Sequence, residues 1–555
     1  MAISLGIHAG HDRGACIIKD GEVLAAIAQE RIDQIKHSPS VNIPYEAIDK
    51  LLEYCNIQIQ EVSCIGFSLV AIEGDAVLNL YKQEFFAHYN CNYIPFYFVS
   101  HHDAHAYSVY YSSGFDDCLV FVADGGGDFI NNMQESETMY IVKNGIFTKI
   151  DRRLQNIAVR HMKDPINHMI PYMPAPVQKL EMSLARKYSQ ITNLLGFQSG
   201  EEGKTMGLAS YGSSLLNFDA PYNVGLSFSL TYADMLKDFF CFQYISGMDL
   251  KSYIKENRAD IAKTVQDFTE KSIISIVNYY IERYHIHKIC FVGGIFLNCL
   301  TNHKVLEQCN IEDAFFLPAS GDDGQALGCA YYAYAMQYGW EQKYQICLPY
   351  LGLSYSDEQI IEAIQKKNLK YKYYDDFTLS KKIAKDIAEN KIIAIHRGRS
   401  EIGPRALCHR SIIANPSNPE MKDILNSRVK HRENFRPFAP TVTEEDQYKY
   451  FNLRKSSEYM LLATLVKPEY QSALSSVTHV DNTARVQAVS RQSEPFIYSL
   501  LKEVEKETGY PVVLNTSFNV AGKPMVESPL DTLNTFLGTD IDILVIGNYV
   551  IEEKS

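Results

Sequence analysis

The feature that most constrains the fold is a pattern that occurs twice in the first third of the chain. It consists of an apolar β-run, a loop rich in Asp and Gly, and a hairpin. The first copy comprises residues 3–8, the loop Gly10-His11-Asp12, and residues 15–18 and 23–28 around Asp20-Gly21. The second comprises residues 118–122, the loop Asp124-Gly125-Gly126-Gly127-Asp128, and residues 139–142 and 146–150 around Asn144-Gly145. Asp-Gly or Asn-Gly between apolar runs is a strong hairpin signal.

Two copies of this pattern predict an α/β chain that begins with a duplicated nucleotide-binding fold of the actin/sugar-kinase (ASKHA) type. In that fold the two loops face each other across an ATP cleft. Two unrelated hairpins are the alternative that the pattern leaves open. The remaining elements expected in the first domain are a helix-rich insertion at about 160–285, strands at 288–292 and 315–317, and a helix at 326–338.

A domain edge is expected around residues 348–352, because helix and strand patterns start afresh after it. The expected elements there are a helix at 356–366 and strands at 392–395, 512–514 and 543–546. The sequence therefore predicts one domain at 1–349 and a second α/β domain at 350–555.

Charge and composition exclude several classes of protein. The 555 residues carry a formal net charge of -13, which disfavours a nucleic-acid partner. The 12 cysteines form no C-x-x-C pair, so neither a zinc ribbon nor a disulfide framework is indicated, and reduced thiols are expected. Neither a signal peptide nor an uncharged apolar run long enough to span a membrane is evident. We expect a cytoplasmic protein without membrane or nucleic-acid partners.

The segment 100–106 contains a two-ligand metal half-site. His101 and His105 are four residues apart, so both imidazoles lie on one face of a helix. Imidazole suits Zn, Fe, Ni and Cu, and carboxylates supply harder ligands. The pattern lacks the Glu of the metalloprotease H-E-x-x-H motif. Two histidines used for capping or for core packing are the alternative.

Carboxylates and glycines follow predicted strands at three further places. Asp124 ends a β-run before glycines that let a ligand approach the backbone, although a simple Asx turn has the same sequence. Gly293-Gly294 follows another strand and leads to Asn298. Gly321-Asp322-Asp323-Gly324 opens a helix; here we expect one Asp to be a metal ligand and the other an N-cap. The residues that we expect to contact ATP are Gly125, Gly126, Gly293, Gly294 and Asn298.

The second domain contains the most basic runs in the chain, at 397–411 and 430–440. Arginine binds phosphate oxygens bidentately and stays charged at every relevant pH. Such runs in an acidic protein indicate an anionic partner, either carboxylates of the same chain or a small phosphorylated ligand. The polar segment 514–519 follows a predicted strand, at the end where α/β sheets place ligands.

Together these motifs resemble the NodU/CmcH family of O-carbamoyltransferases, which includes the tobramycin carbamoyltransferase. The resemblance covers nearly the whole chain. It is carried, in the family's order, by GHDRGA at residue 10, SHHDAHA at 100, EGKTMGLASYG at 202, GGIFLN at 293, EIGPRAL at 401, HRENFRPFAP at 431 and LNTSFN at 514.

The resemblance implies two kinds of site. A first domain similar to threonylcarbamoyl-transferring enzymes would hold a divalent metal, typically Fe(II), with Mg²⁺ as another option. Its implied ligands are His101, His105, Asp124 and Asp322, and its implied transfer residues are His11 and Lys36. A YrdC-like second domain would bind carbamoyl phosphate through Arg405, Arg410, Lys430, Arg436 and Asn515.

The implied activity is ATP-dependent carbamoyl transfer. Carbamoyl phosphate and ATP would give carbamoyl adenylate in the second domain, and an acceptor hydroxyl would take the carbamoyl group in the first. The family implies a small-molecule acceptor in natural product, antibiotic or sugar biosynthesis. A tRNA threonylcarbamoyl transferase-like enzyme is the alternative. The oligomeric state stays open, with a homodimer as one option.

Two segments depart from the family's pattern. Cys408-His409 stands where a Gly and a small polar residue are expected after GPRAL, and Arg13-Gly14 replaces a small polar pair after His11-Asp12. The first departure bears on the shape of the loop between Arg405 and Arg410, and the second on contacts with the acceptor or phosphate.

Overall fold

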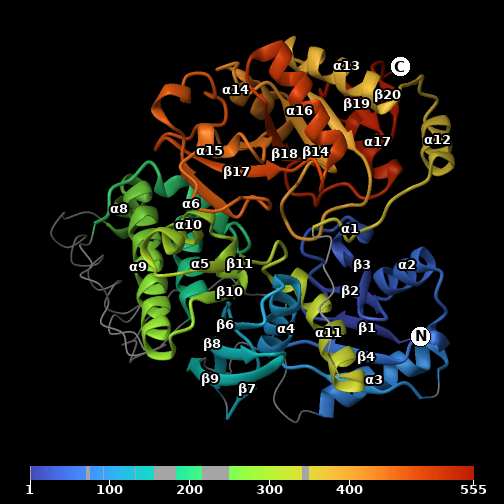
Figure 1. Ribbon diagram of the computed structural model, residues 1–555, viewed down its shortest axis with the longest axis vertical. Helices are drawn as coiled ribbons and strands as arrows, with labels where there is room; N and C mark the ends of the chain where they lie inside the picture. Colours follow the sequence, from blue (N-terminus) through green and yellow to red (C-terminus); the bar gives the residue numbers. More distant parts are fainter. Residues whose placement is uncertain are drawn as a thin grey trace.

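The computed structural model describes residues 2–70, 76–91, 93–131, 133–155, 183–215, 249–339 and 349–554. Three β-sheets organise these residues, two in the lower half of Figure 1 and one in the upper half. Parts of the predicted insertion, 156–182 and 216–248, lie outside the described residues, as do residues 340–348 before the predicted domain edge. No helix in the described ranges is long and apolar enough to cross a membrane. The ten described cysteines are all free.

The first sheet contains the first copy of the repeated pattern. Its strands are β1 (Ile3–His8), β2 (Gly14–Lys19), β3 (Glu22–Ala28), β4 (Cys64–Ser68) and β5 (Phe96–Phe98), in the order β3-β2-β1-β4-β5. The turn between β2 and β3 has positive φ at both Asp20 and Gly21, as a two-residue hairpin requires. Helices α1 (Gln29–Asp33), α2 (Tyr45–Cys55) and α3 (Ala76–Tyr89) connect its strands.

The second sheet repeats this arrangement. Its main strands are β6 (Asp117–Ala123), β8 (Met133–Lys143), β9 (Ile146–Gln155), β10 (Lys288–Val292) and β11 (Asp313–Phe316), and β7 (Phe129–Ile130) pairs with β8. In each sheet the first strand is antiparallel to the second, and the second to the third. The first strand is parallel to the fourth, and the fourth to the fifth. The predicted duplication is confirmed by this repeated order.

Two helices lie between the first and the second sheet, and each has residues of the candidate site at its N-terminal end. They are α4 (His101–Ser113) and α11 (Gln325–Tyr338), which pack on each other, and α11 also packs on β1 and β4. Glycine permits this contact: a Cβ at Gly66 would lie 2.0 Å from the carbonyl oxygen of Cys329, and one at Gly328 would lie 1.7 Å from that of Ala104. The backbones of α4, α11 and the first sheet therefore touch directly.

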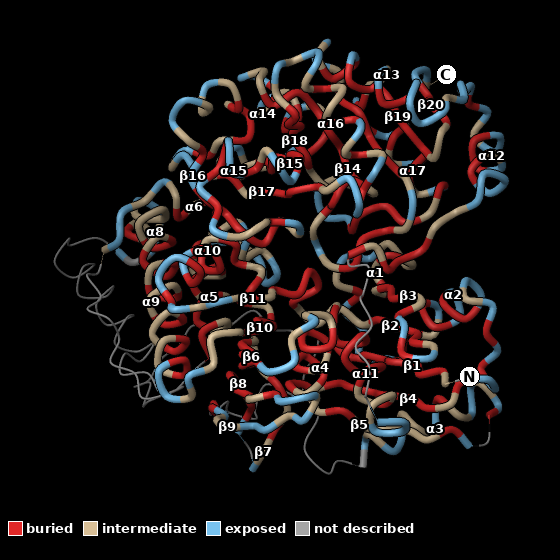
Figure 2. The backbone as a smooth tube through the Cα atoms, in the orientation of Figure 1, coloured by how far each residue is buried: buried red, intermediate tan, exposed pale blue. Residues whose placement is uncertain are grey.

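Helices cover the outer side of the second sheet (Figure 1), and the described part of the region predicted to be helix-rich supplies all but the last of them. They are α5 (Leu184–Leu194), α6 (Glu202–Ala209), α8 (Leu250–Glu256), α9 (Arg258–Tyr284) and α10 (Cys299–Gln308). Residues of α9 such as Phe268 and Ile276 are buried in the same apolar core as Phe291 of β10. Figure 2 shows this buried interior continuing along β6 and β10.

All strands of the third sheet come from the last third of the chain. They are β12 (Lys372–Tyr373), β13 (Ile393–His396), β14 (Arg410–Ala414), β15 (Ala439–Thr443), β16 (Leu462–Leu465), β17 (Thr483–Val489), β18 (Val512–Ser517), β19 (Ile543–Ile546) and β20 (Tyr549–Ile551). Their order is β12-β20-β19-β13-β14-β18-β15-β17-β16. The helices around it are α12 (Asp357–Lys366), α13 (Asp376–Ala388), α14 (Met421–Leu425), α15 (Gln447–Tyr450), α16 (Pro495–Thr508) and α17 (Pro529–Leu537).

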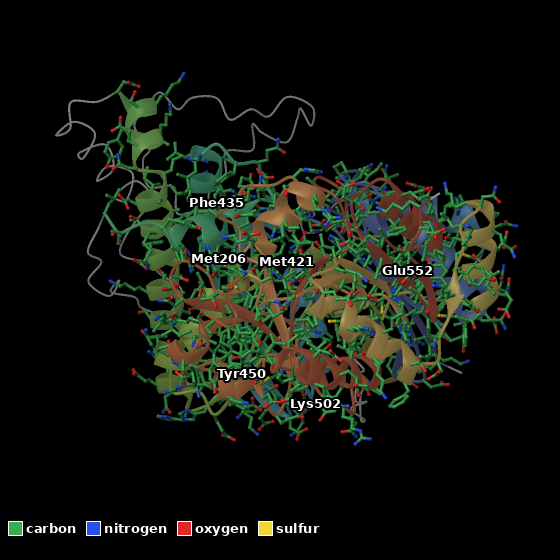
Figure 3. The ribbon with its side chains drawn as sticks, turned by 90° about the horizontal axis from the view of Figure 1, so that it is seen from above. Met206, Met421, Phe435, Tyr450, Lys502 and Glu552 are labelled. Atoms are coloured by element: carbon green, nitrogen blue, oxygen red, sulfur yellow. The ribbon has the colours of Figure 1, made fainter. Side chains whose placement is uncertain are left out.

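The third sheet packs against the second half of the N-terminal region. Asn302 of α10 donates hydrogen bonds to the carbonyl oxygens of Phe296, at 2.7 Å, and Leu461, at 3.0 Å. Phe435 lies beside Phe197, with ring centroids 6.1 Å apart, and Figure 3 shows Phe435 near Met206 of α6. The α/β class is as predicted. The exact division at 349 and 350 stays a prediction.

Candidate functional site

The four residues predicted as metal ligands meet where α4, β6 and α11 converge. Ser100 caps α4 by accepting the backbone N–H of Asp103, so that His101 and His105 occupy the first two turns on one face. Asp124 directly follows β6, and Asp322 begins the 3-10 turn before α11. One ligand atom of each residue lies within 4.8 Å of those of the other three.

The distances describe a compact cage. Nε2 of His101 lies 3.5 Å from Oδ2 of Asp124 and 3.3 Å from Oδ1 of Asp322. Nε2 of His105 lies 3.2 Å from the same Asp322 oxygen. Both histidines are fully buried. Two imidazole nitrogens and two carboxylates form a donor set that suits a divalent transition metal.

The charges in this cage compensate one another. Burial would lower the pKa of His101, but the charges and hydrogen bonds of Asp322 and Asp124 outweigh it and raise that pKa well above its usual value. Burial would raise the pKa of Asp322, but the histidines outweigh it and hold that pKa well below its usual value. The cage is therefore suited to positive charge, either as protons or as a cation.

A second set of contacts orients Asp124. Its Oδ1 accepts the backbone N–H of Gly294, at 2.8 Å. Gly293 has φ +106, and a Cβ there would lie 2.2 Å from the carbonyl oxygen of Ala123. The predicted Gly-Gly loop thus crosses the end of β6 beside the cage, where only glycine fits.

The other residues predicted to contact ATP have partners within the protein. The carbonyl oxygen of Gly125 accepts the Nε–H of Arg186, at 2.6 Å, and a Cβ on Gly126 would lie 2.6 Å from the side chain of Gln134. Asn298 caps α10 by accepting the N–H of Thr301 and is only 8% exposed. Their role in nucleotide binding stays a prediction.

His11 lies at the open edge of the cage. Its Nδ1 is 3.3 Å from Oδ2 of Asp322 and 3.3 Å from Oδ2 of Asp12, and the side chain is 66% exposed. Desolvation lowers the pKa of His11, but the hydrogen bond and charge of Asp322, with the charge of Asp12, raise it well above its usual value. The exposed Lys36 follows α1 and precedes His37, whose Nδ1 lies 2.8 Å from Oδ1 of Asp12.

Sequence reasoning missed two residues of the cage and misassigned a third. His8 ends β1, with Nε2 3.9 Å from Oδ2 of Asp322, and burial lowers its pKa to about 4. Gln325 begins α11 inside the cage. The capping role expected for one Asp of 322–323 is wrong, because the N-cap of α11 is Gly324 and no side chain caps it. His8 is the last residue of a fully buried strand and Gln325 follows a turn, so neither gave a chemical signal.

A second site is formed by cations of the C-terminal region. Five cations influence one another's charge here and form what we call the cation cluster: Arg405, Lys430, Arg432, Arg436 and Arg485. The sequence predicted Arg405, Lys430 and Arg436, but it did not single out Arg432 or Arg485. Burial and the charges of Arg485 and Arg436 lower the pKa of Arg405 to about 9, and burial with Arg436 and Arg485 lowers that of Arg432 to about 9. Buried like charges are costly, and an anionic ligand would offset them, as the nearby Glu433 already does in part for Arg432 and Arg436.

Two donors in this cation cluster have no partner among the residues that the structure describes. They are the buried Nε atoms of Arg405 and Arg485. Nη2 of Arg405 donates to the carbonyl oxygen of Leu297, at 2.9 Å. Buried donors without acceptors are costly, and a ligand carrying several oxygens would satisfy them.

The other residues predicted to bind carbamoyl phosphate differ in how far their polar atoms are already hydrogen-bonded within the protein. Arg410 is fully buried and donates to main-chain carbonyls, including those of Gly398, at 3.1 Å, and Leu353, at 3.2 Å. Nζ of Lys430 donates to Oδ1 of Asn519, at 2.8 Å. Asn515 donates from Nδ2 to Gln487, at 3.0 Å, while its buried Oδ1 has no partner in the described ranges.

Glu401 gives the loop between Arg405 and Arg410 its shape. Its Oε1 accepts the backbone N–H groups of Leu407, His409 and Arg410, at 2.7, 2.9 and 3.1 Å. Cys408 has φ +80, a conformation that favours glycine, and its Sγ lies 3.3 Å from Nδ2 of Asn515. Nε2 of His409 lies 2.7 Å from Oε2 of Glu494. The departure at Cys408-His409 is thus accommodated by contacts that hold the loop.

The two sites approach each other across the contact between the sheets. A Cβ on Gly403 would lie 2.6 Å from the carbonyl oxygen of Pro318, so the arginine loop packs directly on the segment before Asp322. The charge of Asp323 in turn raises the pKa of Arg405, against the dominant effect of burial.

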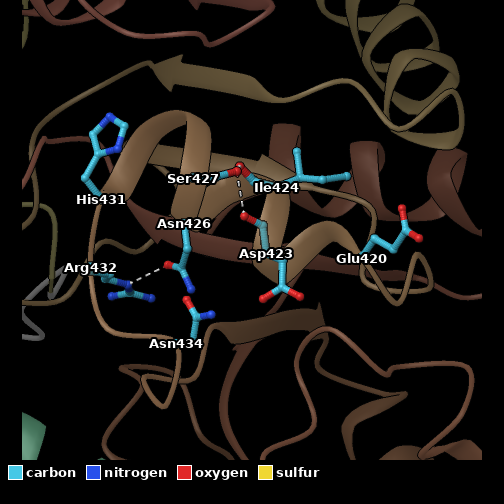
Figure 4. Close-up of a pocket in the computed structure, with 8 residues that line it drawn as sticks. All are labelled: Glu420, Asp423, Ile424, Asn426, Ser427, His431, Arg432 and Asn434. Carbon is cyan, nitrogen blue, oxygen red and sulfur yellow. Dashed lines mark hydrogen bonds between the residues drawn. The ribbon is translucent and has the colours of Figure 1, made fainter.

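A cavity of about 630 Å³ also borders Arg432. Figure 4 shows its lining: Glu420, Asp423, Ile424, Asn426, Ser427, His431, Arg432 and Asn434.

Comparison with known proteins gives a consistent family. Residues 77–331 match the family model described as carbamoyltransferase N-terminus, and residues 384–553 match the one described as carbamoyltransferase C-terminus. The nodulation protein NolNO of Sinorhizobium fredii is 31% identical over 98% of this chain and 79% of that protein. Nodulation protein U of Rhizobium tropici is 35% identical over 42% of this chain and 39% of that protein.

Among solved structures, full-length HypF in its phosphate- and nucleotide-bound form aligns with 61% of this chain and 56% of that chain. The identity is 14% and the TM-score 0.40, a likeness too weak to support any conclusion. The two family models and the NolNO relative, by contrast, span most of the sequence. The chain therefore belongs to the carbamoyltransferase family of enzymes.

Proposed function

We propose that this enzyme transfers the carbamoyl group of carbamoyl phosphate, by way of carbamoyl adenylate, to a hydroxyl group of a small molecule. The proposal is supported above all by the contrast between two neighbouring sites. One is a cluster of five cations in which two buried donors lack partners among the described residues, and the other is a His/Asp cage. A phosphorylated anion suits the first site, and a cation that binds a nucleotide suits the second.

The cation cluster is proposed to activate the carbamoyl group. Arg405, Arg432, Arg436 and Arg485 would bind the phosphate oxygens of carbamoyl phosphate, and the unpaired Oδ1 of Asn515 would accept a hydrogen bond from its amide nitrogen. Water releases phosphate and leaves carbamate. A carbamate oxygen then attacks the α-phosphorus of ATP, pyrophosphate departs, and the arginines offset the negative charge that develops.

The His/Asp cage is proposed to host the transfer. His101, His105, Asp124 and Asp322 would hold a divalent metal, for which Fe(II) is our first candidate and Mg²⁺ the second. When bound, such an ion polarises phosphate oxygens. His11 lies beside Asp322 and would accept the proton of the acceptor hydroxyl as its oxygen attacks the carbonyl carbon and AMP leaves. The raised pKa of His11 means that it serves as a base only when the charge of Asp322 is offset.

The two domains then divide the reaction. Residues 1–349 would be the ASKHA-type transfer domain and residues 350–555 the YrdC-like domain that binds the donor. Gly403 abuts Pro318, so the segments that carry the two sites adjoin. An internal transfer of the adenylate between them would shield it from water, which would hydrolyse it. The helices α5, α6 and α9 would form part of the wall around the acceptor.

The test supplies the purified enzyme with ATP, carbamoyl phosphate and a panel of hydroxylated acceptors, including sugars, aminoglycosides and bulk tRNA. We expect pyrophosphate release that depends on carbamoyl phosphate, and a small acceptor that gains one carbamoyl group by mass spectrometry. The absence of pyrophosphate release would contradict the proposal. Modification of tRNA instead of any small molecule would favour the threonylcarbamoyl transferase-like alternative.

A further inference from the structure

Gln325 lies at the centre of the His/Asp cage. It is the first residue of α11 and is fully buried. Its Nε2 lies 2.9 Å from Nδ1 and 2.8 Å from Nε2 of His101, 3.2 Å from Nε2 of His105 and 3.0 Å from Oδ1 of Asp322. One amide nitrogen is therefore within hydrogen-bonding distance of three of the four candidate ligand atoms.

This position has a simple electrostatic meaning. The ligand atoms of the cage repel one another unless protons or a cation lie between them. An amide –NH₂ group offers two donor protons, so it serves as a weak substitute for a cation. The amide oxygen points the other way, where it accepts the hydroxyl proton of Ser68, at 3.0 Å. Gln325 thus holds the cage together with its donor end.

We propose that Gln325 is a fifth ligand of the metal, and that its side-chain amide group rotates when the metal binds, so that its oxygen and nitrogen exchange places. The inference rests on the proposed metal centre. The terminal torsion of a Gln side chain is soft, so exchange of Nε2 and Oε1 needs no backbone movement. Oε1 would then face the cation, and Nε2 would face Ser68. In the cage without metal, the amide nitrogen faces the ligand atoms, because an amide oxygen there would be repelled by their lone pairs. In the cage with metal, the amide oxygen faces the cation, because it can then act as a ligand.

The surroundings of Ser68 suit both orientations. A serine hydroxyl can donate one hydrogen bond and accept others, so it can pair with either end of the amide. Ser68 is 1% exposed and lies 2.9 Å from Nδ1 of His8 and 3.1 Å from Sγ of Cys329. These contacts fix the hydroxyl at the end of β4, where it can pair with the amide before and after the turn.

The experiment measures the affinity of the full chain for Co²⁺ alone, by competition with a chelator, and records the visible absorption of the bound ion. Gln325→Leu removes the ligand oxygen and should weaken binding by about 10- to 100-fold, the scale on which groups that support metal ligands act. It should also change the absorption bands. Gln325→Glu places a carboxylate at the same position and should bind at least as tightly as the unmodified enzyme.

The controls separate this inference from the metal centre itself. His105→Ala should lose binding altogether, whereas Gln325→Leu should only weaken it. Unchanged or tighter binding in Gln325→Leu, with an unchanged spectrum, would overturn the fifth ligand and leave the metal centre standing. If the unmodified enzyme binds no Co²⁺, the metal centre fails and the inference fails with it. If Gln325→Leu does not fold, weaker binding in Gln325→Glu overturns the proposal.

Discussion

The His/Asp cage and the cation cluster solve the problem of buried charge in opposite ways. In the cage, His101 and His105 lie 3.2–3.3 Å from Oδ1 of Asp322, so acids and bases are interleaved. In the cluster, burial and the charge of Arg485 lower the pKa of both Arg405 and Arg432, and two donors of the cluster lack partners in the described residues. A site that compensates its own charge is stable when empty, whereas one that concentrates charge of one sign depends on its ligand.

The largest effect is expected from a substitution in the His/Asp cage, which should stop the transfer step and leave the cation cluster working. His105→Ala should remove the metal and reduce carbamoyl transfer to the acceptor by at least about 100-fold, the scale of losing one preorganised electrostatic group. Pyrophosphate release at the cation cluster should persist. Metal analysis and an assay of both products check this. A variant that keeps its full metal content would mean that the histidine pair is structural.

The reciprocal change should produce the reciprocal defect. Arg436→Ala should reduce pyrophosphate release by about 100-fold or more, because a guanidinium that offsets transferring charge is lost. Metal content should be unchanged. The matched control is Arg491→Ala, which removes an exposed arginine of the same region. Equal loss in both variants, or normal turnover in Arg436→Ala, would break the distinction between the sites.

Arg410 should give an effect of a different kind, on stability and not on catalysis. Its donors are used by main-chain carbonyls and it lies 3.9 Å from Glu527, so Arg410→Met removes one of the two arginines, with Arg31, that face this buried carboxylate. We expect a loss of about 3–5 kcal/mol in the free energy of unfolding, measured by chemical denaturation. If the variant keeps its stability but loses affinity for carbamoyl phosphate, Arg410 is a ligand after all, as the family resemblance implies.

The smallest effect concerns a histidine that is buried without a carboxylate. His396 is 2% exposed, and burial with the charges of Arg410 and His409 holds its pKa well below the usual value. The unfolded chain takes up that proton near pH 6.5 and the folded chain does not, so stability is full above this pH and falls below it. The fall is at most about 1.4 kcal/mol per pH unit.

Denaturation of the enzyme and of His396→Gln at several pH values between neutrality and mild acid checks this sign. The variant should lose less stability on acidification, because it has no imidazole to protonate. An equal loss in both proteins would show that other groups control the acid limb. The contrast with His101, whose pKa the cage raises, would then need another explanation.

The sequence predicted those parts of the sites that follow from local spacing. His101 and His105 share a helix face because they are four residues apart, and Asp124 lies in the cage because it directly follows a strand. Spacing could not distinguish Arg405 from Arg410, because the partners of each side chain come from segments distant in sequence. Arg485 stands within the strand β17 with no neighbouring motif, so only the three-dimensional structure placed it in the cluster.

The glycines beneath α11 give the cage a dependence that its own residues do not reveal. A Cβ on Gly66 or Gly328 would lie only 2.0 or 1.7 Å from a carbonyl oxygen of the neighbouring backbone. The position of α11 therefore leaves no room for a side chain at either glycine. Asp322 and Gln325 stand at the amino end of that helix. A single added carbon atom, placed on a residue with no chemical role, would tilt the helix and misalign the ligands that it carries.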